Sequence, residues 1–245
     1  AGAMVTTYTY KRLIGISTVT DPNAMETSYE YDNFGRLAVV RDNTGDLVTS
    51  NHYDSNGTNA AKNFVRTVTY RKDGMAVEPI NSFATVETAQ TITTYYDGLG
   101  RAIQQNAYQS GHESKDIITH MAYDRHGRQL KSYLPYAGAI SGAFDPDAKT
   151  NVQLYYAGQY NVQTNVCYSE KFYHPSPLNR LRKQAAPGEV WQGNPENDND
   201  HTIRFVYSVN DIDEVRRYEA VIDGDYVPSL QVNGFYDAAQ LSKTV

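Results

Sequence analysis

Tyr31-Asp32-Asn33-Phe34-Gly35-Arg36 is the first of three copies of one hexapeptide in this chain of 245 residues. The other two are Tyr96-Asp97-Gly98-Leu99-Gly100-Arg101 and Tyr123-Asp124-Arg125-His126-Gly127-Arg128. Each copy keeps tyrosine, aspartate, glycine and arginine at the same positions. A unit that recurs along a chain is typical of a repeat architecture, in which neighbouring units share one core. We therefore interpret the hexapeptide as a building element and not as a catalytic loop.

The residues inside and around the hexapeptide predict β-hairpins. The aspartate can accept hydrogen bonds from the amides just ahead of it, and glycine adopts a positive φ without steric cost. Short alternating runs lie beside the turns, as in Thr27–Tyr31 and Arg36–Val40. Tyr10, Tyr31 and Tyr53 recur at spacings of 21 and 22 residues. This pattern indicates strand, turn and strand in each unit.

Weaker copies continue the pattern, and the arginine suggests how units are joined. The decayed copies are Tyr53–Gly57, Tyr70–Gly74 and Tyr236–Leu241. In each full copy the arginine lies four residues after the aspartate. A tight turn can bring its guanidinium back to that carboxylate or across to the tyrosine of the next hairpin. We expect these arginines to tie one repeat to the next, with a ligand-binding row of arginines as the rival interpretation.

These motifs resemble the YD-repeat, or Rhs-repeat, family of large bacterial cell-surface and secreted proteins. Residues 31–45 match its repeat, which is Tyr-Asp-x-x-Gly-Arg-Leu, a short apolar run and Asp-x-x-Gly. A second pattern resembles a domain of unknown function that accompanies Rhs repeats. Its segments are Thr91–Arg101, Lys115–Thr119, Tyr133–Tyr136, Ser176–Arg180 and Ala186–Glu189.

The resemblance implies an all-β fold of tandem antiparallel hairpins joined into one curled, continuous sheet, an open segment of a shell or barrel-like solenoid. In toxin-delivering members of the family, such a shell encloses a variable C-terminal toxin that is released by self-cleavage. The Asp-Pro pairs here, Asp21-Pro22 and Asp145-Pro146, lack the Gly-Leu-rich surroundings of that cleavage junction. The chain is therefore interpreted as an excerpt of the shell wall, with cargo and release chemistry elsewhere or absent. The partners that the resemblance implies are adjoining repeats of a parent chain and either an enclosed toxin domain or a surface glycan or protein.

Three blocks are expected along the chain. Residues 1–4 are interpreted as a cloning remnant, 5–75 as regular repeats, and 76–245 as a divergent β-repeat region packed continuously with the first block. Within the last block, 137–165 is the least strand-like stretch, and Ala148–Tyr156 is compatible with a short helix or an extended excursion. Strands are expected at Ile203–Tyr207 and Glu214–Tyr218.

The composition argues against several classes of binding partner. A formal charge of −6 and a pI near 5.5 argue against nucleic acid or an anionic membrane surface, which attract clustered lysine and arginine. No run of about 18 apolar residues is present, so no membrane insertion is expected. The lone Cys167 excludes an internal disulfide and is expected to be a small buried residue.

Residue types capable of catalysis or metal binding occur, but each has a simpler interpretation. Glu189 beside Trp191, or Asp198 with Asp200, could pair as glycosidase carboxylates, although sequence cannot place them at the required separation. His120, Asp124 and His126 could ligate zinc, with solvent-facing histidines as the alternative. Asp198-Asn199-Asp200 resembles a calcium loop but lacks its glycine and distal glutamate, so a flexible acidic loop is favoured. We expect no catalytic, metal-binding or cofactor-binding residue and no cofactor.

The sequence thus predicts a non-enzymatic structural scaffold, secreted or at the cell surface of a bacterium, that forms a wall or shell around or beside a variable domain. The alternative is a carbohydrate- or protein-binding adhesin module that uses the tyrosine- and Trp191-bearing surface. A glycan-active enzyme is a third interpretation, which needs a concave cleft with paired carboxylates.

Overall fold

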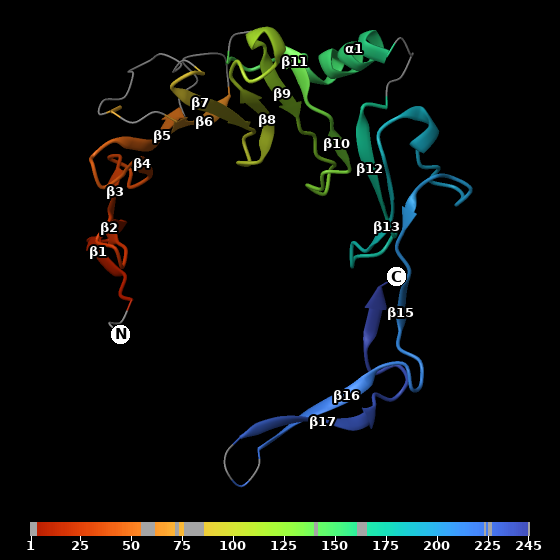
Figure 1. Cartoon of the computed structure of the whole chain (residues 1–245). Coiled ribbons are helices and arrows are strands. Elements are labelled where there is room, and N and C mark those ends of the chain that lie inside the picture. The colour runs from red at the N-terminus through yellow and green to blue at the C-terminus, as the bar shows by residue number, and fades with distance from the viewer. Residues whose placement is uncertain are drawn as a thin grey trace. The chain divides into compact units, whose positions relative to one another are not determined.

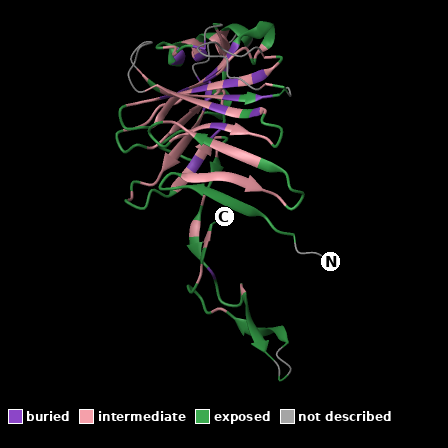
Figure 2. Ribbon diagram, turned by 90° about the vertical axis from the view of Figure 1, so that its left-hand side faces the viewer, coloured by how far each residue is buried: buried purple, intermediate pink, exposed green. Residues whose placement is uncertain are grey.

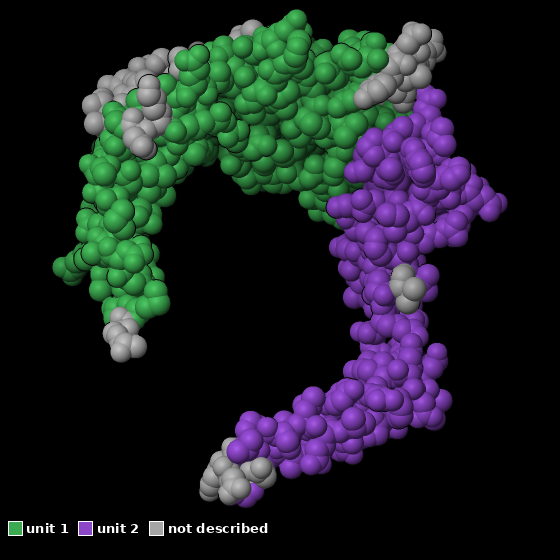
Figure 3. Space-filling model, in the orientation of Figure 1, with its two compact units in different colours: residues 1–168 green, residues 169–245 purple. Residues whose placement is uncertain are grey.

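The computed structural model describes residues 4–54, 62–71, 74–75, 86–139, 142–160, 166–222, 224 and 227–244. The chain divides into two compact units, Ala1–Tyr168 and Ser169–Val245 (Figure 3). The expected change from regular to divergent repeats near residue 75 stays a prediction. The corners of the decayed copies at 53–57 and 70–74 fall largely outside the described residues.

The first unit is built on a ten-stranded antiparallel sheet whose strands follow one another in chain order from β1 to β9, with β11 beside β9 (Figure 1). Its strands are β1 Thr7–Lys11, β2 Gly15–Thr20, β3 Glu26–Tyr31, β4 Leu37–Arg41, β5 Leu47–Asp54, β6 Asn63–Tyr70, β7 Ala89–Tyr96, β8 Ala102–Ala107, β9 Asp116–His120 and β11 Tyr136–Gly138. Figure 1 shows this sheet curving along the series of strands. The expected all-β class, with hairpins joined into one curled sheet, is confirmed.

Burial alternates along the central strands, as expected for a sheet covered on one face (Figure 2). On β7, Ala89, Thr91, Thr93 and Tyr95 are buried while the residues between them are half-buried. In β1, by contrast, every residue is exposed. The sheet is therefore best protected in its middle and least protected at its β1 edge.

One α-helix occurs in the described residues, α1 Ala148–Tyr160, and it covers the sheet near β9 and β11. Its Val152 is fully buried against Ile118 of β9 and Tyr136 of β11. Cys167 belongs to the same core, so the expectation of a buried thiol is confirmed, and burial raises its pKa. The helix, one of two alternatives left open by the sequence, is longer than the expected segment. A short strand, β10 Lys131–Tyr133, also lies in this unit, linked to Met121 by a bridge at Ser132.

A second cluster of buried side chains lies under strands β4 to β7. It comprises Val39, Leu47, Val68, Tyr70 and Ala89. These residues come from four different strands, so the cluster forms only when successive hairpins are stacked. A single hairpin of this size could not bury them alone.

The second unit contains short antiparallel strands. β12 Tyr168–Tyr173, which begins at the last residue of the first unit, pairs with β13 Leu181–Ala185, and β13 pairs with β14 Ile203–Arg204. Two further pairs are β15 Tyr207–Val209 with β18 Ser242–Thr244, and β16 Arg216–Ile222 with β17 Pro228–Phe235. Short 3₁₀ turns occur at His112–Ser114 in the first unit and Glu189–Trp191 in the second.

Both strand predictions in this unit need correction. The strand expected at 203–207 is interrupted, because Phe205 continues the pairing with Arg182 only through its amide and β15 then begins at Tyr207. The strand expected at 214–218 begins at Arg216 and extends to Ile222, since Asp211 and Glu214 form a turn before it. Among the described residues, no helix has the length and apolar character needed to cross a bilayer.

Candidate functional site

Each hexapeptide forms a closed corner between two strands. At the first corner, Oδ1 of Asp32 accepts hydrogen bonds from the amides of Phe34 and Arg36, both at 2.9 Å. The Gly35 amide donates to the Asp32 carbonyl at 3.0 Å, and Gly35 has a φ of 75°. The aspartate therefore caps the turn, and glycine supplies the left-handed conformation that closes it.

The same geometry is repeated at the other two copies. Oδ1 of Asp97 and of Asp124 each accept two amide bonds within 2.9 Å, and Gly100 and Gly127 have φ values of 75° and 77°. Two turns outside the hexapeptides, 21–24 and 42–45, have the same form. Their last residues, Ala24 and Gly45, have φ values of 63° and 88°. The corner is thus encoded locally by its aspartate and by the residue three positions later.

The arginine of each corner returns to the aspartate that caps it. Arg36 Nε lies 2.7 Å from Asp32 Oδ2, and the matching distances from Arg101 Nη2 and Arg128 Nη2 to their aspartates are 2.7 and 2.8 Å. The pKa values of the three carboxyls lie below 3.8. Burial raises the pKa of all three carboxyls, but hydrogen bonds from the backbone and from the arginine together outweigh it at each corner.

Arg36 and Arg101 also reach the tyrosine of the following hairpin. The guanidinium carbon of Arg36 lies 4.2 Å from the centre of the Tyr53 ring, and that of Arg101 lies 4.6 Å from the Tyr123 ring. These distances are those of cation–π contacts. One arginine therefore joins the carboxylate of its own corner to an aromatic ring one hairpin further along.

The tyrosine hydroxyls complete the link by bonding back to the preceding hairpin. Tyr53 donates to the Leu37 carbonyl at 2.9 Å, Tyr123 to the Ala102 carbonyl at 2.8 Å, and Tyr31 to the Ile16 carbonyl at 2.8 Å. The last contact requires a glycine beneath the ring, because a Cβ at Gly15 would lie 2.6 Å from the Tyr31 hydroxyl. Sequence reasoning did not single out Gly15, which is the first residue of β2.

Removing one of these hydroxyls should weaken the sheet measurably. Tyr123→Phe is expected to lower the free energy of unfolding by about 1 kcal/mol, because the half-buried Ala102 carbonyl loses its donor. Urea unfolding followed by circular dichroism would measure the change. Tyr8→Phe, on the fully exposed strand β1, is the matched control and should be near neutral. An equal effect of both substitutions would argue against a role for the hydroxyl in linking hairpins.

Buried polar side chains of the sheet bind the backbone of Gly142 and Ala143, which precede α1. Asp116 of β9 is fully buried, and its Oδ2 accepts a hydrogen bond from the Gly142 amide at 2.6 Å. The Tyr95 hydroxyl donates to the Gly142 carbonyl at 2.8 Å, and the Asn106 side chain donates to the Ala143 carbonyl. A polar side chain from each of the strands β7, β8 and β9 therefore forms a hydrogen bond with the backbone of Gly142 or Ala143. Sequence reasoning missed all three, since isolated polar residues on strands are ordinarily predicted to be exposed.

The candidate zinc ligands are not brought together. His120 packs against the Tyr133 ring with centroids 5.0 Å apart, whereas the Asp124 carboxylate is occupied by the corner and by Arg128. His126 lies in the exposed turn, where its ring meets Arg125. Within the described residues, no group of three His, Cys, Asp or Glu side chains is arranged to hold a metal ion.

His120 should make the stability of the first unit sensitive to mild acid. Its pKa is lowered below 6.5, first by burial and then by the nearby Lys149 ammonium, while Asp145 opposes the shift. A group whose folded pKa is depressed contributes stability above its unfolded pKa and loses it as the pH falls. We therefore expect the melting temperature to drop between pH 7.5 and 5.5, and His120→Gln to flatten that drop. A variant with an unchanged pH profile would contradict this assignment.

The acidic loop of the second unit is organised around a buried lysine. Lys183 of β13 has a fully buried side chain, and its Nζ lies 2.6 Å from Asp200 Oδ2 and 3.5 Å from Asp198 Oδ1. Its ammonium also donates to the carbonyls of Asn194 and Asn197, the latter at 2.8 Å. The side chain thus supplies the cation for a loop that sequence reasoning treated as flexible and acidic, or as a calcium site.

Asp200 is held in its charged form by this arrangement. Burial raises the pKa of the carboxyl, but hydrogen bonds from Lys183, Thr202 and the Asn194 amide outweigh it, so the pKa lies well below 3.8. Its side chain is only 6% exposed. The geometry therefore assigns Asp198 and Asp200 to charge pairing with Lys183, and not to a water-filled cleft of the kind that glycoside hydrolysis requires.

The remaining candidates, Glu189 and Trp191, lie in an exposed 3₁₀ turn. Trp191 is 48% exposed, and its ring meets the edge of His201 with centroids 5.5 Å apart. Trp191 is therefore about half exposed to solvent.

Comparison with known proteins identifies the repeats. Residues 66–205 match the family described as Domain of unknown function (DUF6443), and residues 12–47 match the RHS Repeat. The chain belongs to the DUF6443 family. The first match covers most of the region expected to resemble a domain that accompanies Rhs repeats, and the second contains the first hexapeptide. The expected membership is confirmed.

Solved structures share the fold of this family member. The crystal structure of TcdB2-TccC3 aligns over 93% of the chain at 14% sequence identity with a TM-score of 0.51. That of TcdB2-TccC3-TEV aligns over 94% at 12% identity with a TM-score of 0.52. The chain spans 13% and 16% of those two chains. A search of curated proteins found no match.

Proposed function

We propose that this chain is a non-enzymatic wall segment of a larger exported bacterial Rhs-repeat protein, in which the curled sheet encloses a variable domain such as a toxin. The observation that carries this proposal is the chain-order sheet from β1 to β9, whose hairpins are joined by the same aspartate, arginine and tyrosine contacts. Such contacts stiffen a surface and leave no need for a catalytic role for the repeated residues.

The β1 edge supports a position within a longer wall. β1 pairs with β2 on one side, and all five of its residues are exposed. An unpaired edge strand is a template for further strand pairing. Adjoining repeats of the parent chain would satisfy this edge, and they are the partners that we propose for it. The small share of the related structures that the chain spans also fits a segment of a longer protein.

Protease protection in the full-length protein tests enclosure. The domain that follows the repeats should resist trypsin while it is part of the native full-length protein and should be cleaved rapidly when it is produced alone. Equal cleavage rates in the two forms would contradict a shell. Secretion into the culture medium or display on the cell surface would test the proposed export.

An adhesin role is a second candidate, favoured by the half-exposed Trp191. An exposed indole offers an apolar ring face to a sugar or to a protein partner. Glycan-array binding that is abolished by Trp191→Ala would support this role. Binding that is absent, or that survives the substitution, would remove the candidate.

A further inference from the structure

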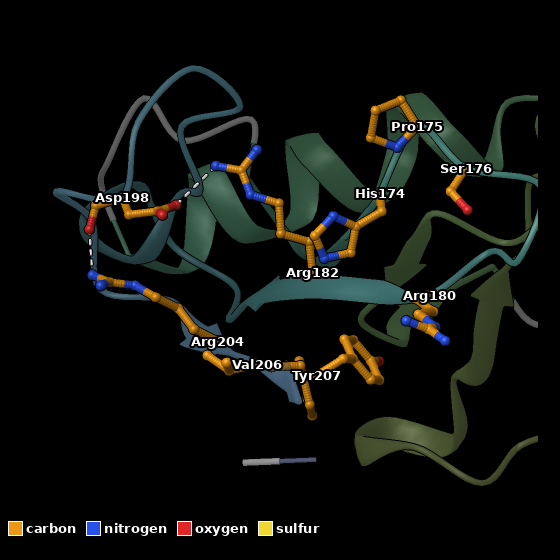
Figure 4. Close-up of a pocket in the computed structure, with 10 residues that line it drawn as sticks. His174, Pro175, Ser176, Arg180, Arg182, Asp198, Arg204, Val206 and Tyr207 are labelled. Atoms are coloured by element: carbon orange, nitrogen blue, oxygen red, sulfur yellow. Dashed lines mark hydrogen bonds and ion pairs between the residues drawn. The ribbon is translucent and has the colours of Figure 1, made fainter. Parts of the chain in front are cut away.

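The second unit contains a cavity with an excess of positive charge (Figure 4). Its volume is about 560 Å³, within the range of small-ligand sites. Arg180, Arg182 and Arg204 line it, together with His174, Tyr207 and one carboxylate, that of Asp198. Three guanidinium groups and a single carboxylate leave the cavity cationic in a chain whose formal charge is −6.

Two of the arginines are held in place by the protein. Arg182 Nη2 lies 2.9 Å from Asp198 Oδ1, and Arg182 Nη1 donates to the Pro195 carbonyl at 3.3 Å. Arg204 donates to the carbonyl of Asp198 from the other side, as Figure 4 shows. The hydrogen bond from Arg182 is the main cause of the lowered pKa of Asp198. Because these guanidinium groups are already oriented, a ligand would not have to order them.

Arg180 supplies the positive charge of the cavity that no described carboxylate neutralises. Its guanidinium carbon lies 5.3 Å from the centre of the Tyr207 ring, and that ring meets the edge of His174 at 6.2 Å. Across the described part of the chain, no carboxylate lies within ion-pair distance of Arg180. Figure 4 shows Arg180 beside Tyr207, apart from the two arginines that meet Asp198.

From these contacts we propose that the cavity binds a small ligand through an oxyanion, a carboxylate or a phosphate group. A planar guanidinium group donates two parallel, charge-assisted hydrogen bonds to two oxygens of a carboxylate or phosphate group. The tyrosine and histidine rings provide an apolar wall beside the anion. The acidity of the whole chain disfavours an extended polyanion, whose binding depends on many distributed cations. This site does not depend on the wall function proposed above.

Titration with citrate and with inorganic phosphate tests the proposal, with chloride at equal ionic strength as the reference. The arginine Nε–Hε signals in nuclear magnetic resonance spectra provide the readout. We expect saturable shifts of the Arg180 and Arg182 signals with citrate, phosphate or both, and the more effective anion identifies the source. Arg180→Gln should weaken this binding at least about tenfold.

Arg217→Gln on the exposed strand β16 is the matched control, since it removes the same charge from the same unit outside the cavity. It should leave the titrations unchanged. Shifts that fail to saturate, that chloride reproduces, or that persist in Arg180→Gln would overturn the proposal. The unfolding transition of Trp191 shows whether each variant is folded, and Arg204→Gln provides an independent second variant on another strand.

Discussion

Replacing Lys183 with methionine is expected to lower the free energy of unfolding of the second unit by about 3–5 kcal/mol. Methionine preserves most of the side-chain volume but removes the ammonium, leaving the buried Asp200 carboxylate and two loop carbonyls without their cation. Removing one partner of a buried ion pair costs far more than removing an exposed charge. Trp191 is the only tryptophan in the chain and lies in this unit, so its fluorescence during urea unfolding measures the effect.

Two further variants separate the ion pair from general damage to the strand. Lys171→Met, on the neighbouring strand β12, removes a lysine for which the described residues offer no ion-pair partner, and it should have little effect. Lys183→Met combined with Asp200→Asn should recover part of the loss, because no buried charge is then left unpaired. A Lys183→Met protein as stable as the wild type would show that the ammonium does not organise the loop.

Removing the corner arginines is expected to loosen the sheet of the first unit. Arg101→Ala together with Arg128→Ala should lower the melting temperature by about 4–8 °C, since both corner ion pairs and the cation–π contact of Arg101 with Tyr123 are lost. Thermal unfolding followed by circular dichroism is the measurement.

Arg125→Ala is the control for this pair. Arg125 lies in the same corner as Arg128, but its described contact is with the exposed His126 ring and not with the Asp124 carboxylate. Its loss should leave the melting temperature within about 1 °C of the wild type. If the double substitution proved equally harmless, the arginines would not join the repeats.

The corners were predictable from sequence because their contacts are local. An aspartate, a glycine three positions later and an arginine one position beyond that specify the turn, its cap and its ion pair without help from the rest of the chain. The strands followed from the alternation between such corners. The sequence distance between successive strands is short, and this made the sheet order predictable, since each strand from β1 to β9 pairs with its neighbours in sequence.

Contacts between distant residues were not predictable in this way. Lys183 lies on a strand whose letters, Leu181-Arg182-Lys183-Gln184-Ala185, give no sign that the lysine is buried. Its partner Asp200 comes 17 residues later, beyond an irregular loop. Asp116 likewise meets Gly142 across 26 residues. Lysine and aspartate are almost never buried unless they are paired, and sequence alone does not reveal the pairing.

The grouping of the cavity arginines was also not predictable from sequence. Arg180 and Arg182 lie close in sequence, but Arg204 reaches the cavity only because β14 pairs with β13. A count of charges over the chain gives −6 and conceals this local excess of positive charge. Function located in such a site depends on the pairing of short strands, which the hydrophobic pattern specifies weakly.

Electron cryomicroscopy of the full-length protein that contains this chain would test the wall function most directly. The account predicts that β1 to β9 run in chain order within a continuous wall, that a strand from adjoining repeats pairs with β1, and that the sheet borders a closed volume that holds the variable domain. A β1 edge that faces solvent, with the variable domain outside the sheet, would contradict it.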